Sequence, residues 1–134
     1  MLDPRIERMI AETRQQAAMT PASTRDLREA IESSPFLSDL MVKAIEAGSL
    51  RKITFDLPNH EGGHYDAQLR SISVNSDSLD RPRRTERIDQ LTSILGHETG
   101  HAMMARSTEL SANRLSYELD HAIKEAAEYG DPTV

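Results

Sequence analysis

The feature that most constrains the fold is a long helical periodicity between Thr85 and about Ser107. Apolar residues recur there at three- and four-residue spacings, which place them on one face of a helix: Ile88, Leu91, Leu95 and Ala102. Thr85 can cap this helix after the polar, proline-containing stretch NSDSLDRPRR. The segment is apolar over more than one stripe, which is typical of a central helix that other elements enclose.

The N-terminal half predicts three shorter helices followed by two strands. The helices are expected from Asp3–Pro4 towards Pro21, from Thr24, and from about Phe36 to Ala47, where Gly48 ends the last one. The segments KITFDL at 52–57 and RSISV at 70–74 place alternate apolar residues on one face, as strands do. The stretch between the two strands is expected to be a loop.

A last helix is predicted from about Thr108 or Ser111 to Tyr129. Its apolar side is formed by Leu115, Leu119, Ala122, Ile123 and Ala126. A chain of 134 residues is the size of one domain, so we expect a single domain over 1–134. It would comprise a helical N-terminal region, 1–48, and a part, 49–134, with the strands, the central helix and the C-terminal helix. The fold class is α+β, with a small sheet and a helical majority.

Composition excludes several classes of protein. The chain is 37% apolar and 28% charged with a net charge of −6, which argues against non-specific binding of nucleic acid. The one basic cluster, RPRR at 81–84, is short and is expected to be a solvated loop. The absence of cysteine excludes disulfides and thiolate zinc sites. No apolar run is long enough for a signal peptide or a membrane span, so a soluble protein is expected.

Residues 97–101, HETGH, lie inside the predicted central helix. Helical spacing places His97 and His101 one turn apart on the same side. Two such imidazoles with an intervening glutamate form the His-Glu-x-x-His pattern, in which the histidines bind Zn²⁺ and the glutamate activates a water. Because Ile94 and Met104 flank the pair, we predict His97 and His101 as metal ligands and Glu98 as general base. Glycine is costly within a helix, so a close approach of another group is expected at Gly100.

Residues 60–64, HEGGH, repeat the same pattern in a different context. They follow Pro58 and Asn59, and adjacent glycines are unfavourable in a helix by about 1 kcal/mol each. We therefore predict a turn in which Gly62 and Gly63 supply positive φ angles. His60 and His64 then have no reason to share a face, although His64 is a candidate for a substrate contact.

The segment from the second strand onwards, roughly residues 65–130, resembles the zincin metallopeptidases. The resemblance lies in a strand, RSISV, followed by a loop and a helix reading LTSILGHETGHAMM. It implies that the strand is a sheet edge that pairs with an extended substrate, that His97 and His101 bind zinc, and that Glu98 is the base. The extended metzincin pattern is absent, since Met104 and Ser107 occupy the positions of its glycine and third histidine.

The resemblance is closer to gluzincins, which take a third zinc ligand, a glutamate, from a following helix. Glu118 and Glu125 both border the apolar stripe of the predicted last helix, and KEAAEYG resembles the segments that supply this ligand. We therefore predict Glu125 as third ligand, with Glu118 or His121 as alternatives. The oxyanion stabiliser is not identified by the sequence; the candidates are Tyr117, Tyr129 and His64.

The chain also resembles zincin domains of bacterial effectors and polymorphic toxins that specialised secretion systems deliver. This likeness implies a protein or peptide substrate and a cognate immunity protein as partner, with no role for nucleic acid or membrane. Two other functions remain open at this point. One is a peptidoglycan amidase or endopeptidase with the same zinc chemistry, and the other is a non-catalytic interaction domain that retains the helix.

Overall fold

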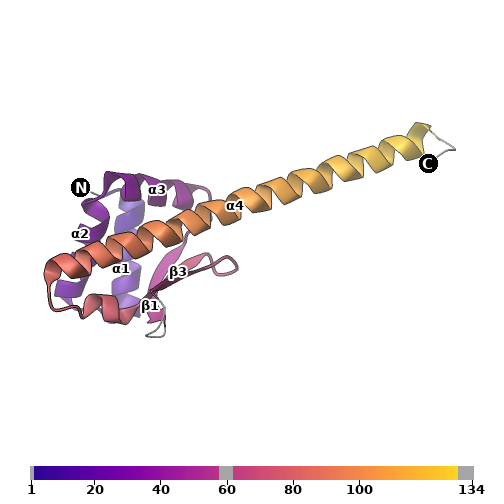
Figure 1. Ribbon diagram of the computed structural model, residues 1–134. Helices are drawn as coiled ribbons and strands as arrows, with labels where there is room; N and C mark the ends of the chain where they lie inside the picture. The colour runs from indigo at the N-terminus through magenta and orange to yellow at the C-terminus, as the bar shows by residue number, and fades with distance from the viewer. Residues whose placement is uncertain (1, 58–61, 130–134) are drawn as a thin grey trace.

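The computed structural model describes the backbone of residues 2–57 and 62–129, with side chains except at 57, 106–120, 122, 123 and 125–129 (Figure 1). The elements in chain order are α1 (Pro4–Gln16), α2 (Pro21–Glu32), α3 (Pro35–Glu46), β1 (Lys52–Leu57), β2 (Gly63–Asp66), β3 (Ser71–Asn75), the 3₁₀ helix η1 (Ser76–Leu79) and α4 (Arg84–Tyr129). The predicted α+β class with a helical majority is confirmed. Among the described residues, no helix is both long and apolar enough to span a membrane.

The three N-terminal helices begin in the same way. Each has a proline in its first turn and, before it, a side chain that accepts a hydrogen bond from a free backbone N–H; the pairs are Asp3–Pro4, Thr20–Pro21 and Ser34–Pro35. The prediction that the second helix begins at Thr24 is wrong by one turn, because Thr20 provides the cap.

The sheet has three strands in the order β1–β3–β2. β1 is parallel to β3, and β2 is antiparallel to it. The sequence predicts β1 and β3 but not β2, which has only four residues, two of them polar and one a glycine. As a result β3, the strand RSISV, lies in the centre of the sheet. The expectation that it forms the edge is wrong, and β2 occupies that edge instead.

One face of the sheet and all four helices form the hydrophobic core. Ile53, Ile72 and Val74 from the strands are fully buried. They belong to one cluster with buried side chains from each helix, among them Ile6, Ile10, Leu27, Ile31, Leu37, Met41, Leu91 and Leu95. The N-terminal half of α4 packs against α2, α3 and β2. This packing leaves one flank of α4 beside the edge strand β2.

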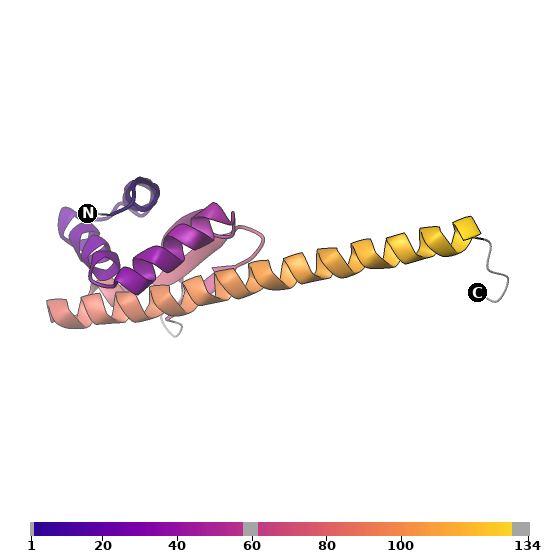
Figure 2. The ribbon, with the colours of Figure 1, turned by 90° about the horizontal axis from the view of Figure 1, so that it is seen from above.

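Helix α4 continues for 46 residues from Arg84 to Tyr129. The prediction of two helices separated near Thr108 or Ser111 is therefore wrong. The segment between Ala105 and Tyr129 contains neither glycine nor proline, so nothing in the backbone interrupts the helical hydrogen bonds. The C-terminal half of α4 extends away from the body formed by the other elements (Figures 1 and 2).

A buried ion pair anchors the start of α4. Asp26 of α2 is 5% exposed. Its carboxylate accepts hydrogen bonds from Arg84 Nε at 3.3 Å and from Arg87 Nε at 2.8 Å. Arg84 also bonds Glu29. Since a buried carboxylate is tolerated only with such partners, these contacts fix the entry of α4 onto the body.

We predict that Asp26→Asn lowers the free energy of unfolding by about 2 kcal/mol, because Arg87 loses its charged partner while the amide remains enclosed. Urea denaturation followed by circular dichroism measures the change. Asp39→Asn, at an exposed position of α3, is the matched control and should change stability by less than about 0.5 kcal/mol. Equal effects of the two substitutions would contradict the anchoring role of Asp26.

Candidate metal centre

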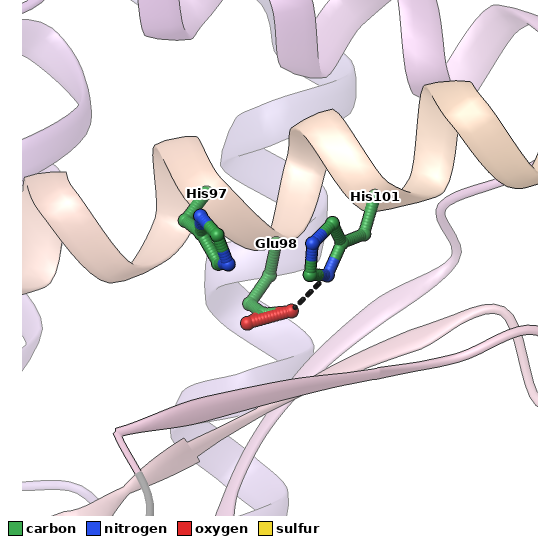
Figure 3. A group of neighbouring side chains, drawn as sticks. All are labelled: His97, Glu98 and His101. Carbon is green, nitrogen blue, oxygen red and sulfur yellow. Dashed lines mark hydrogen bonds and ion pairs between the residues drawn. The ribbon is translucent and has the colours of Figure 1, made fainter.

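His97, Glu98 and His101 form a cluster on the flank of α4 (Figure 3). One potential ligand atom from each residue lies within 4.8 Å of the others. The two imidazole rings are 4.4 Å apart between centroids and inclined at 63°. The segment HETGH is helical, as predicted, and this periodicity brings the two histidines together.

The three side chains differ in their environment. Glu98 is 4% exposed, whereas His97 and His101 lie at the surface. His101 Nδ1 and Glu98 Oε1 are 3.0 Å apart (Figure 3). In the tautomer that carries its proton on Nδ1, His101 donates this hydrogen bond and its Nε2 retains the lone pair that a metal requires. The buried carboxylate therefore orients one imidazole for coordination.

Strand β2 lies directly against this part of α4. A Cβ atom at Gly63 would be 2.5 Å from Ile94 Cγ2 and 3.1 Å from Glu98 Cγ. A Cβ atom at Gly62 would be 3.8 Å from Ile94 Cδ1. Gly63 thus allows the edge strand to approach the helix at HETGH, whereas a methyl group at Gly62 would make only an ordinary van der Waals contact. Their predicted role, supplying positive φ, is wrong, because Gly48 is the only glycine with positive φ among the described residues.

No other backbone segment of the described chain approaches Gly100, so that expectation is wrong, whereas the alternative of a close approach by a substrate stays a prediction. No neighbouring atom that the structure describes lies within 4 Å of a Cβ built there, and the same holds for Gly96. The crowded glycine of this site is instead Gly63, on the facing strand. Sequence reasoning missed it because contact between a strand and a helix distant in sequence leaves no local pattern.

Of the two histidines of HEGGH, the structure describes only His64, which does not join the cluster. His60 and Glu61 lie outside the described residues. His64 is exposed in β2, opposite Ser73 of β3. Since neighbouring strand residues face opposite sides and Gly63 faces α4, His64 lies on the other face of the sheet. The structure thus separates His64 from the cluster, which argues against the expected substrate or oxyanion contact.

The predicted third ligand is not brought to the cluster either. Glu125, and its alternatives Glu118 and His121, lie on the same continuous helix as His101. At a rise of about 1.5 Å per residue, they are about 36, 26 and 30 Å along the axis from His101. The side chains of Glu118 and Glu125 are outside those described, as are those of Tyr117 and Tyr129. In this conformation none of these residues shares an ion with His97 and His101 of the same chain.

The donor set nevertheless suits zinc. Imidazole nitrogens and carboxylate oxygens are its usual ligands when cysteine is absent. Donors around a tetrahedral zinc are about 3.4 Å apart, so side-chain rotations suffice to close a cluster whose atoms lie within 4.8 Å. A cation would also compensate the charge of Glu98, which is buried beside an imidazole. The three residues therefore fit a metal, and two histidines supply two of the three protein ligands that a catalytic zinc usually has.

Comparison with known proteins adds no relative, since neither a protein-family profile, nor a curated protein, nor a solved structure matches the chain.

We predict that Gly63→Ala destabilises the chain by about 1–3 kcal/mol, because the added methyl group overlaps Ile94 and crowds Glu98. Thermal or urea unfolding measures the loss. In the double variant Gly63→Ala/Ile94→Ala the clash with Ile94 is removed, so the two changes should be non-additive. Additive effects would contradict the contact between β2 and α4.

A second prediction concerns the course of α4. Because the chain has no native cysteine, two introduced cysteines at the exposed positions Ser93 and Lys124 can carry spin labels. Electron–electron resonance should give about 47 Å between these positions in the metal-free protein, from about 1.5 Å per residue. A distal segment folded back onto HETGH would reduce the backbone separation to about 10 Å. A shortening on addition of zinc would restore Glu118, His121 or Glu125 as same-chain ligands.

Proposed function

We propose that the chain is a zinc-dependent hydrolase of peptide bonds, in which His97 and His101 hold the metal and Glu98 acts as general base. The observation that carries this proposal is the cluster itself, with two imidazoles and a buried carboxylate whose donor atoms converge within 4.8 Å. A third ligand is required in addition. The likeness of HETGH and its preceding strand to zincins supports the same reaction class.

Zn²⁺, when bound, would act as a Lewis acid that polarises the substrate carbonyl and lowers the pKa of a bound water to about 7. Glu98 would take a proton from water and pass it to the leaving amine. Its Oε1 lies 3.0 Å from His101 Nδ1, and its Oε2 lies on the side of Gly63. The burial of Glu98 among Ile94 and the backbone of Gly63 excludes bulk water from its inner side.

The edge strand β2 is the element best placed to present a substrate. It pairs with β3 on one side only, and Gly63 at its start contacts Glu98. An extended peptide added to this edge would pass beside the cluster, because strand edges bind peptides through their free N–H and C=O groups. The zincin resemblance implies that RSISV pairs with the substrate. In this fold we assign that role to residues 63–66 instead.

The biological setting follows only from resemblance. Effector and polymorphic-toxin metallopeptidases would act on a protein substrate in a target cell and be neutralised by an immunity protein. A peptidoglycan amidase or endopeptidase would use the same three residues on a different amide. A non-catalytic interaction domain would retain α4, and its biological effect would not change when the general base is removed.

We predict that Glu98→Gln retains zinc and lowers hydrolysis of an unfolded protein substrate by at least about 10³-fold, since glutamine keeps the shape of the side chain but cannot accept the proton. His97→Ala and His101→Ala should each lose stoichiometric zinc, measured by mass spectrometry. The matched control is His64→Ala, which alters a histidine on the other face of the sheet and should leave the metal content unchanged.

The outcomes separate the three functions. Turnover of purified sacculi but not of unfolded protein would favour the cell-wall amidase. Activity retained by Glu98→Gln would exclude this glutamate as base. A biological effect that survives Glu98→Gln without any hydrolysis would favour the interaction domain.

A further inference from the structure

A cleft lies at the opposite edge of the sheet from the candidate metal cluster. It has a volume of about 560 Å³ and is bounded by the end of α1, the α1–α2 turn, β1 and η1. We call it the β1 cleft. Part of its lining is apolar and includes Met19, Ile53, Phe55 and Leu79. Clefts of this volume that combine apolar side chains with a few polar groups are typical of ligand sites.

The backbone of β1 is exposed to this cleft. β1 is an edge strand, and the carbonyl of Ile53 points outward, since it accepts a hydrogen bond from Thr13 Oγ1 of α1 at 2.9 Å. Peptide groups alternate along a strand, so those of Phe55 point outward too. The register with β3 shifts between Thr54 and Leu57, so Phe55 lies at a β-bulge. The outward peptide groups of this edge strand are the groups with which another extended chain would pair.

The charged groups that line the β1 cleft have one sign. Asp56 and Asp80 contribute carboxylates, and no lysine or arginine is among the described residues that line it. Asp56 Oδ1 accepts a hydrogen bond from Thr54 Oγ1 at 2.8 Å, which orients the carboxylate. Two acidic groups beside apolar side chains complement a side chain that has an aliphatic stem and a cationic end.

We propose that the β1 cleft binds an extended peptide segment that carries an arginine or lysine, through strand pairing with Phe55 and ion pairs to Asp56 and Asp80. The aliphatic stem of the basic side chain would lie against Phe55 and Leu79. Main-chain pairing gives affinity and the carboxylates give the preference for a basic residue.

Ala18, which lines the cleft, has φ of 51°, an uncommon left-handed conformation for a residue other than glycine.

This site is distinct from the metal cluster. β3 separates β1 from β2, so the two edges of the sheet face different surroundings. A segment bound along β1 does not contact His97 or His101. The β1 cleft would therefore hold a substrate or partner at a second point, and its occupancy does not depend on zinc.

The test uses nuclear magnetic resonance of the ¹⁵N-labelled chain, treated with a chelator, with two synthetic peptides as probes. Acetyl-Thr-Val-Arg-Val-Thr-amide should shift the amide signals of Phe55, Asp56 and Leu79. The matched peptide with glutamate in place of arginine should bind at least about tenfold more weakly. Because Glu98→Gln leaves the β1 cleft unchanged, that variant should bind the arginine peptide as the parent chain does, whatever the outcome for hydrolysis.

The double variant Asp56→Asn/Asp80→Asn should weaken the arginine peptide at least about tenfold, whereas Asp89→Asn, an exposed change on α4, should not. Equal binding of the two peptides, or shifts confined to β2 and α4, would overturn the proposal. So would butylguanidinium binding as tightly as the arginine peptide, which would indicate a site for small organic cations. Absence of any shift at millimolar peptide would overturn it as well.

Discussion

The contact between Gly63 and helix α4 is the constraint on which the site depends. It brings a sheet edge against the one turn of the helix that carries His97, Glu98 and His101, and it leaves no room for a side chain between them. Glu98 is buried because the strand covers it. A buried carboxylate attracts a nearby cation more strongly than an exposed one does, because the local dielectric is lower. The strand and the helix thus form one packing unit around the candidate site.

Most of the fold could be predicted from local signals. Proline and a capping side chain define the start of each N-terminal helix, alternation defines β1 and β3, and 3.6-residue periodicity places His97 and His101 together. These features depend on residues close in sequence. Three points remain predictions: zinc as the bound ion, Glu98 as the general base, and peptide hydrolysis as the reaction. The geometry is compatible with this chemistry but does not test it.

Features that depend on distant contacts could not be predicted. β2 is four residues long and weak in strand character, and it exists because its backbone pairs with β3 and packs on α4. Gly63 and Gly100 illustrate the limit, since both are glycines in a His-Glu-x-x-His segment and only Gly63 faces a neighbour. The continuity of α4 was missed for another reason. Serine and threonine are good helix caps. They interrupt a helix, however, only where the backbone leaves the helical conformation.

The length of α4 links the metal cluster to the distal half of the helix. Leu115, Leu119 and Ala122 each follow His97, His101 and Met104 by 18 positions, which is about five helical turns and therefore the same face. In the body, by contrast, the buried face of α4 carries Leu91 and Leu95. The apolar periodicity of the sequence is thus in a different phase in the two halves of α4. In the described half, Met104, which is 68% exposed, follows His97 by seven positions and lies on the same side of the helix as the two histidines.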